Sequence, residues 1–316
     1  MLLKKVHTAM QVSAEAYTLR FAPDKPYVYV DDRDHHRIAE LFFLSSVHPL
    51  NGRDDTLRIG AWEASETPGE IVLSITVESS AWSKKIIRFR CQPQRFVYEI
   101  EVEGQGQLCD VHYFGGYYSG HVRWGSGFFY SGQRFFQGFN PDPNTDEINY
   151  FWPAENSLIE LMGVPLPGKA NWFFTPPPFC YAFQAGSAWM GMGVETQAGR
   201  NNYTQYGYHG KRSSFYLSLS FEGHTRINGR YRLPEIGFDF GESEYEVMAA
   251  HILALQSAGY APAATRRPTP RWWHEPIFSG WGEQCYLASL VKGNAPDFAR
   301  QEHYEKALAT LDQNQV

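Results

Sequence analysis

The sequence predicts a mainly β protein: a large antiparallel β-sandwich, then one connecting helix, then a single β/α unit. Three observations lead to this prediction. Short apolar or alternating segments, separated by Gly, Pro, Asn and Asp, fill the chain from about residue 17 to residue 240. After residue 240 the apolar period becomes helical, and beyond a proline-bearing segment at 261–270 the order is strand, loop, helix. Many short strands at this spacing are typical of a sandwich.

The strand predictions rest on alternation. Ile71, Leu73, Ile75 and Val77 fall at every second position of 71–77, which places them on one face against a core. The segments 85–91 and 96–102 are joined by Gln92, Pro93, Gln94 and Arg95 and are expected to form a hairpin. The other expected strands are Tyr27–Val30, Leu57–Ala61, Trp189–Val194 and Ser214–Phe221.

Between residues 128 and 183 the chain is rich in aromatic residues and proline. Prolines at 176, 177 and 178 exclude a central strand there, because proline has no backbone N–H to donate. We expect long ordered loops held by aromatic packing.

A helix is expected over 243–258. Ser243 and Glu246 form a capping box, and Gly259 stands where a helix end favours a left-handed residue. Four apolar residues fall on one helical stripe: Tyr245, Met248, Ile252 and Leu255.

The last 46 residues predict a strand at Pro276–Gly280, a loop at Trp281–Gln284 and a helix that starts near Pro296. Tyr304, Leu308 and Leu311 share one face of this last helix. One β/α unit cannot bury its own apolar face or pair both strand edges, so we expect further units to complete it.

Composition narrows the function. The chain has 316 residues and a formal net charge of −6, so neither nucleic acid nor a membrane surface is an expected partner. The four cysteines are far apart and the N-terminus carries no apolar signal segment, so we expect a reducing, cytoplasmic location. No phosphate-binding loop, dinucleotide motif or G-x-S-x-G elbow occurs, and no cofactor is implied. The 22 Phe, 19 Tyr and 9 Trp supply core packing and flat faces suited to sugars.

Two clusters carry metal-ligand residue types. The first is Asp31, Asp32, Asp34, His35 and His36, which we interpret as a solvated acidic turn because neighbouring strand residues point to opposite sides. The second lacks the glycine and terminal glutamate of a calcium loop, and we interpret it as a series of Asx turns: Asn140, Asp142, Asn144, Asp146 and Glu147.

The segment PRWWHEPIFSGWGEQ at 270–284 follows the predicted sandwich and helix. With HYFGGY at 112–117, FNPDPN at 139–144 and the aromatic strands near 173–195, the chain resembles the N-terminal region of retaining glycoside hydrolases related to families 31 and 36. The resemblance implies a β-supersandwich at 1–240, a linker helix and proline-rich connection at 241–270, and the start of a (β/α)8 barrel at 271–316. The sharpest part of the resemblance is confined to residues 271–287.

The resemblance also implies what this chain contributes. In such enzymes the catalytic carboxylates lie on later barrel strands, so no catalytic residue is assigned here and the chain alone is expected to be inactive. Trp281, Glu283 and Gln284 would follow the first barrel strand and contact the α-linked sugar substrate, whereas in the alternative they only cap the barrel core and hold a loop. Trp272, Trp273 and His274 precede that strand and are expected to pack. The implied partners are a carbohydrate and the remaining barrel segment or a completing chain. The alternative function is a non-catalytic carbohydrate-binding or scaffold sandwich.

Overall fold

The computed structural model divides the chain into two compact units, unit 1 (Met1–Ala263) and unit 2 (Ala264–Val316). The residues it describes are 1–6, 9–22, 25–119, 121–125, 127–130, 133–134, 159–161, 173–174, 180–185, 188–197, 199–211, 214–262, 269–274 and 279–314. Most of the segment 128–183, including the second metal-ligand cluster and its predicted loops, therefore lies outside the described residues.

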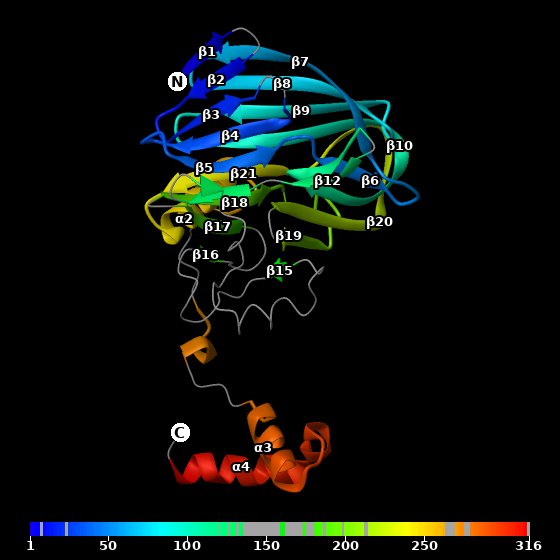
Figure 1. Ribbon diagram of the computed structural model, residues 1–316. Helices are drawn as coiled ribbons and strands as arrows, with labels where there is room; N and C mark the ends of the chain where they lie inside the picture. The colour runs from blue at the N-terminus through cyan, green and yellow to red at the C-terminus, as the bar shows by residue number, and fades with distance from the viewer. Residues whose placement is uncertain are drawn as a thin grey trace. The chain divides into compact units, whose positions relative to one another are not determined.

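Unit 1 is built from two sheets (Figure 1). The smaller sheet has seven strands in the order β1-β2-β3-β4-β5-β13-β14, and its neighbouring strands are antiparallel. Their bounds are β1 Leu2–Val6, β2 Ala9–Ser13, β3 Tyr17–Phe21, β4 Tyr27–Asp32, β5 Arg37–Phe42, β13 Gly127–Tyr130 and β14 Gln133–Arg134.

The larger sheet has 14 strands, with a main path β12-β11-β7-β8-β9-β10-β21-β18-β17-β16. Its pairs are antiparallel except for β11 with β7. The bounds are β6 Ser46–Pro49, β7 Asp55–Thr67, β8 Glu70–Ser79, β9 Lys84–Cys91, β10 Arg95–Tyr113, β11 Gly115–Tyr118, β12 His121–Gly125, β15 Ile159–Leu161, β16 Phe173–Phe174, β17 Cys180–Ala185, β18 Ala188–Glu195, β19 Gln205–Lys211, β20 Ser214–Arg232 and β21 Glu235–Gly241.

The core lies between the two sheets, and the predicted alternation is confirmed. Ile71, Leu73, Ile75 and Val77 are each 3% exposed or less, because every second side chain of β8 points inward. Phe21 of the smaller sheet meets Phe89 of the larger one edge-on, with ring centroids 5.3 Å apart. The predicted fold class, mainly β with large sheets and few helices near the C-terminus, is confirmed.

The helix predicted at 243–258 is confirmed as α2 (Glu244–Ser257). The Ser243 hydroxyl accepts from the backbone N–H of Glu246 at 3.3 Å, and the Glu246 carboxylate accepts from the N–H of Glu242 at 2.8 Å. The helix packs on β17, β18 and β21 and buries Val247 and His251, whereas Tyr245 and Ile252 of the predicted apolar stripe are exposed. It therefore covers one end of the larger sheet.

The close packing of α2 on β18 gives a first testable expectation. A Cβ atom at Gly193 would lie only 2.3 to 2.6 Å from three atoms of the His251 ring, which is itself fully buried. We expect Gly193→Ala to lower the free energy of unfolding by about 1–3 kcal/mol, because the helix must shift to admit the methyl group. Urea denaturation followed by tryptophan fluorescence measures this, with Gly282→Ala, where nothing lies within 4 Å, as the control. Equal stability of the Gly193 variant and wild type would contradict the packing described.

Unit 2 contains two 3₁₀ helices, η1 (Arg271–His274) and η2 (Ala295–Phe298), and two α-helices, α3 (Trp281–Val291) and α4 (Gln301–Gln313). Residues 276–278 of the predicted strand lie outside the described residues. The loop predicted at Trp281–Gln284 is wrong, because these residues form the first turn of α3. The last helix is predicted to start near Pro296, but Pro296 falls in η2 and α4 begins five residues later, at Gln301.

The two α-helices of unit 2 meet through a few close contacts. Gln284 donates to the Tyr304 hydroxyl at 2.6 Å, and a Cβ at Gly280 would fall 2.5 Å from the Tyr304 ring. Gly280 thus permits the close approach of α4 to the start of α3.

Candidate functional site

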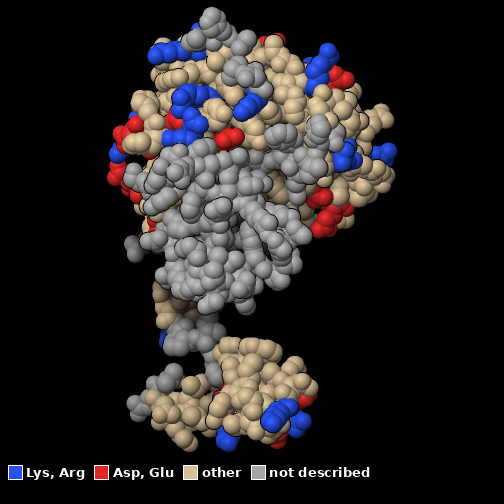
Figure 2. All heavy atoms as spheres, in the orientation of Figure 1, with Lys and Arg blue, Asp and Glu red and all other residues tan. Residues whose placement is uncertain are grey.

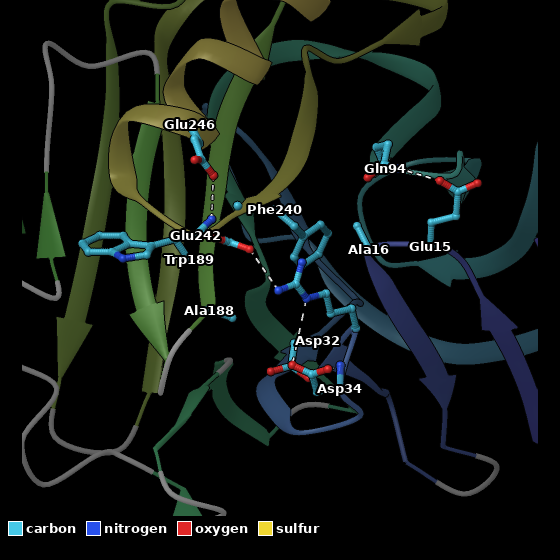
Figure 3. A pocket seen from close by; sticks show the side chains of 12 residues that line it. Glu15, Ala16, Asp32, Asp34, Gln94, Ala188, Trp189, Phe240, Glu242 and Glu246 are labelled. Atoms are coloured by element: carbon cyan, nitrogen blue, oxygen red, sulfur yellow. Dashed lines mark hydrogen bonds and ion pairs between the residues drawn. The ribbon is translucent and has the colours of Figure 1, made fainter.

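A groove of about 860 Å³ opens at one end of the sandwich in unit 1, where turns from both sheets meet (Figure 3). We call it the end groove. The smaller sheet contributes the β2–β3 and β4–β5 turns, and the larger sheet contributes the β9–β10 turn, the start of β18 and the junction of β21 with α2. Its lining residues are Glu15, Ala16, Asp32, Arg33, Asp34, Gln94, Ala188, Trp189, Phe240, Gly241, Glu242 and Glu246.

Hydrogen bonds between the sheets hold one wall of the end groove. The backbone N–H groups of Glu15 and Ala16 both donate to the Pro93 carbonyl, at 3.0 and 3.2 Å. The Gln94 side chain donates to the Glu15 carboxylate at 2.6 Å. The β2–β3 turn is therefore fixed against the β9–β10 turn.

On the opposite wall, Arg33 donates to the Glu242 carboxylate at 2.9 Å. The two residues are 209 positions apart in the chain, and both side chains are more than 60% exposed. Exposed ion pairs of this kind contribute little to stability. Both side chains thus keep contact with solvent at the mouth of the groove.

The β4–β5 turn is shaped by the Asp32 carboxylate, which accepts from the backbone N–H groups of Asp34 and His36 at 2.9 and 2.8 Å. The prediction of a solvated turn holds for residues 33–36, which are exposed, but is wrong for Asp31 and Asp32, which are buried. Asp31 is buried because Arg20 and Arg37 pair with it at 2.7 and 2.6 Å.

This turn brings metal-ligand groups together. One ligand atom from each of Asp32, Asp34 and His36 lies within 4.8 Å of the others. The hydrogen bonds of the turn account for this proximity, since Asp32 organises the backbone of both partners.

Two aromatic side chains line the end groove. The Phe240 ring stacks on Tyr17, with centroids 5.0 Å apart and an interplanar angle of 17°. Tyr17 is itself fixed by hydrogen bonds from its hydroxyl to the carbonyls of Gln92 and Arg95, both at 2.9 Å. Trp189 is 4% exposed and packs against Ala182 and Val247, and its ring points away from the other labelled side chains in Figure 3. Phe240 is therefore the aromatic surface that a ligand would meet.

The charges of the end groove select among ligand classes. One arginine and five carboxylates line it, so the groove repels anions and admits cations or neutral polyols. Carboxylates accept hydrogen bonds from hydroxyl groups, and the arginine donates to hydroxyl oxygens. On the face drawn in Figure 2, the acidic and basic side chains of the described residues form small separate groups. The arrangement suits a neutral, hydroxyl-rich ligand with one flat apolar face.

The carboxylates of the end groove also serve its own structure. Asp32 holds the β4–β5 turn, Glu15 accepts from Gln94, and Glu242 accepts from Arg33. Glycoside cleavage by two carboxyl groups needs one of them protonated and the other free to attack. Asp32, Glu15 and Glu242 are instead engaged in contacts within the protein.

Among known proteins, the matches to this chain are solved structures of low sequence identity. No protein-family model and no curated protein matches the chain. An α-N-acetylgalactosaminidase from Bifidobacterium bifidum in complex with GalNAc is 10% identical, covering 79% of this chain and 39% of its own, with a TM-score of 0.43. A glycoside hydrolase family 97 enzyme from Pseudoalteromonas sp. strain K8 in complex with acarbose is 8% identical, covering 75% of this chain and 34% of its own, with a TM-score of 0.38. Both are glycoside hydrolases. The chain spans less than half the length of each, and the narrower assignment to families 31 and 36 stays a prediction.

The substrate-binding residues predicted from the sequence lie in unit 2, at the start of α3. Trp281 is 58% exposed, Glu283 is exposed, and Gln284 is 6% exposed because it faces Tyr304. Residues two apart in a helix point in different directions, so α3 directs Trp281 and Glu283 to different sides. Their sugar-binding role stays a prediction.

Apart from Asp32 and Asp34, which the sequence placed in a metal-ligand cluster, the residues of the end groove were not singled out as a site by sequence reasoning. Glu246 was considered only as part of a capping box, and Phe240 only as the point where the apolar period changes. Nothing in the sequence pairs Arg33 with Glu242, because antiparallel sheets bring distant turns together without a local signal.

No described helix is both long enough and apolar enough to span a lipid bilayer.

Proposed function

We propose that this chain is the N-terminal part of a glycoside hydrolase that acts on an α-linked sugar, of the retaining type related to families 31 and 36. Within that protein the end groove binds sugar, and the catalytic carboxylates belong to other barrel segments. The observation that carries the proposal is the Phe240 ring set among five carboxylates and Arg33 in a groove of about 860 Å³. That volume is within the usual range for small-molecule sites.

The surface of unit 2 supports the barrel part of the proposal. Within α3 only Gln284 and Ala288 are buried, and α4 buries no side chain. Large apolar side chains exposed together are usually covered by another part of a protein. Later β/α units of a barrel would cover them: Trp272, Trp273, Trp281, Tyr286, Leu290 and Val291, each 58% exposed or more.

Sugar binding by the purified chain tests the proposal directly. Isothermal titration with methyl α-glycosides is expected to show binding that Arg33→Ala weakens about 10-fold, since a charge-assisted hydrogen bond is lost. Arg58→Ala is the matched control, because Arg58 is also an exposed, ion-paired arginine but does not line the end groove. Absence of binding by any glycoside, or equal effects of the two variants, would overturn the proposal.

Hydrolysis is tested separately. The purified chain is expected not to turn over 4-nitrophenyl α-glucoside, α-galactoside or α-N-acetylgalactosaminide. Turnover that disappears when a carboxylate of this chain is replaced would show that cleavage occurs here, and would overturn the assignment of the catalytic groups to other segments.

The alternative of a non-catalytic carbohydrate-binding or scaffold sandwich has one observation in its favour: every residue that lines the end groove belongs to unit 1. Copurification of a second polypeptide with which the chain hydrolyses α-glycosides would favour the hydrolase. Sugar binding with neither a second polypeptide nor turnover would favour the scaffold.

A further inference from the structure

A second groove, of about 1000 Å³, runs beside α2 on the outer face of the larger sheet. We call it the side groove. One wall is formed by small and aliphatic residues of α2, among them Ala250, Leu253 and Ala254, with Tyr260 beyond the helix end. The floor is formed by charged side chains of β9, β10, β18 and β21: Arg90, Arg95, Glu99, Glu195, Glu235 and Asp239.

Ion pairs make this floor rigid. Arg90 donates to Glu99 and, at 2.7 Å, to Glu235. Arg95 donates to Asp239 at 2.8 Å and also to Glu195. Two arginines thus hold four carboxylates in fixed positions. Because these side chains are already ordered, binding of a ligand to them costs little side-chain entropy.

Two further arginines of the side groove are held loosely. Arg88 approaches Glu101 only to 3.5 Å, and Arg232 approaches the same carboxylate only to 3.7 Å. At these distances their hydrogen bonds are weak, so their N–H groups can turn to a ligand. Arg232 is also 52% exposed.

The balance of charge in the side groove differs from that of the end groove. Four arginines and four carboxylates line it, so it has no overall preference for an anion or a cation. It offers donors and acceptors side by side, which is what the hydroxyl groups of a neutral sugar require.

The two grooves share a boundary. Gln94 and Phe240 line both of them. Both residues therefore lie where the two grooves adjoin, and the Phe240 ring itself stacks on Tyr17. Each groove has the volume of a complete small-molecule site, so together they exceed what one monosaccharide fills.

We propose that the end groove and the side groove form one site for an extended neutral oligosaccharide, which passes over Phe240 and lies along α2. The inference rests on the proposed sugar-binding function and adds the length of the ligand and the path that it follows. An anionic polymer is excluded by the five carboxylates of the end groove, and an apolar ligand by the charged floor of the side groove.

The chain itself offers the test. Two pairs of sugars are titrated: methyl α-glucoside with maltotetraose, and methyl α-galactoside with stachyose. In the pair whose sugar the chain binds, the longer sugar is expected to bind at least about 10-fold more tightly than the methyl glycoside. Arg232→Ala is expected to remove most of that gain and leave binding of the methyl glycoside unchanged. Arg230→Ala is the matched control: it lies two residues away on β20 and approaches the same Glu101, but does not line the side groove.

Hydrogen exchange provides a second measurement that does not depend on a variant. Amides of α2 between residues 250 and 257 are expected to gain protection with the tetrasaccharide and not with the methyl glycoside. Equal affinity for short and long sugars, or equal losses in the Arg230 and Arg232 variants, would overturn the inference. If the methyl glycoside still binds and Arg33→Ala still weakens it, the proposed function stands. If no sugar of either length binds, the proposed function fails as well.

Discussion

Replacing Asp54 with alanine is expected to lower the free energy of unfolding by about 3–5 kcal/mol, because it leaves the charge of Lys85 buried without its partner. Both side chains are fully buried, and Lys85 Nζ lies 2.7 Å from Asp54 Oδ2. The other contacts of this ammonium group are neutral oxygens, the Thr56 hydroxyl at 3.0 Å and the Ser45 carbonyl at 3.2 Å. They cannot balance the charge.

Asp54 also accepts hydrogen bonds from two other segments of the chain. Its carboxylate accepts from the Val47 N–H at 2.8 Å and from the Ser79 hydroxyl at 2.6 Å. The variant therefore loses two further hydrogen bonds at the end of the sandwich where β6, β7 and β8 meet. This places the expected loss toward the upper part of the range.

Urea denaturation measures the effect. Glu78→Ala is the control, because its ion pair with Arg58 is exposed at both ends and is expected to change stability by less than about 0.5 kcal/mol. The double variant Asp54→Ala with Lys85→Met should recover part of the loss, since an apolar side chain of similar length replaces the unpaired charge. A loss below about 1 kcal/mol for Asp54→Ala alone would contradict the role assigned to the pair.

The burial of Lys85 can be predicted from the sequence, but its pairing with Asp54 cannot. Lys85 has the same parity along β9 as Ile87, Phe89 and Cys91, so strand alternation places it on the core face. Its partner cannot be read in the same way. Asp54 precedes β7 in a run of polar residues and reaches Lys85 only because β8 and β9 bring the two segments together.

The same distinction applies to the rest of the fold. Strands β4, β8, β9 and β18 and helix α2 follow from local patterns, namely alternation, a capping box and a terminal glycine. Helix α3 was missed because Gly280 and Gly282 surround its first residue and indicate a turn. The contact of Gln284 and Gly280 with Tyr304, which supports that turn of helix, is tertiary.

The end groove depends wholly on tertiary structure. The turns at 31–36 and 92–95 were predicted, but the shape of the groove comes from contacts such as Arg33 with Glu242 and Glu15 with the Pro93 carbonyl. Such contacts depend on strand order in two sheets, which composition and periodicity do not determine. Sequence reasoning therefore directed attention to Trp281, Glu283 and Gln284, where a recognisable motif lies.

Replacing Arg95 with methionine is expected to cost about 3–5 kcal/mol near neutral pH, because two buried carboxylates lose their cation while the aliphatic part of the side chain is kept. Asp239 is 2% exposed and Glu195 is 5% exposed, and Arg95 donates to both. Arg88→Met is the matched control, since Arg88 lies on the same face but approaches its carboxylates only to 3.5 and 3.9 Å. The control is expected to cost about 1 kcal/mol or less.

The pH dependence distinguishes this electrostatic effect from lost packing. Burial alone would raise the pKa of Asp239, but its interactions with His251 and Arg95 outweigh burial and hold the pKa below its ordinary value. A carboxyl group whose pKa is lowered by folding stabilises the folded state fully above its unfolded pKa of about 4, and that contribution disappears as the pH falls through the folded pKa. The gap between wild type and Arg95→Met should therefore be widest near pH ~7 and narrower near pH ~3, as measured by urea denaturation at both. A gap that does not change with pH would mean that packing of the side chain, and not its charge, holds β10 to β18 and β21.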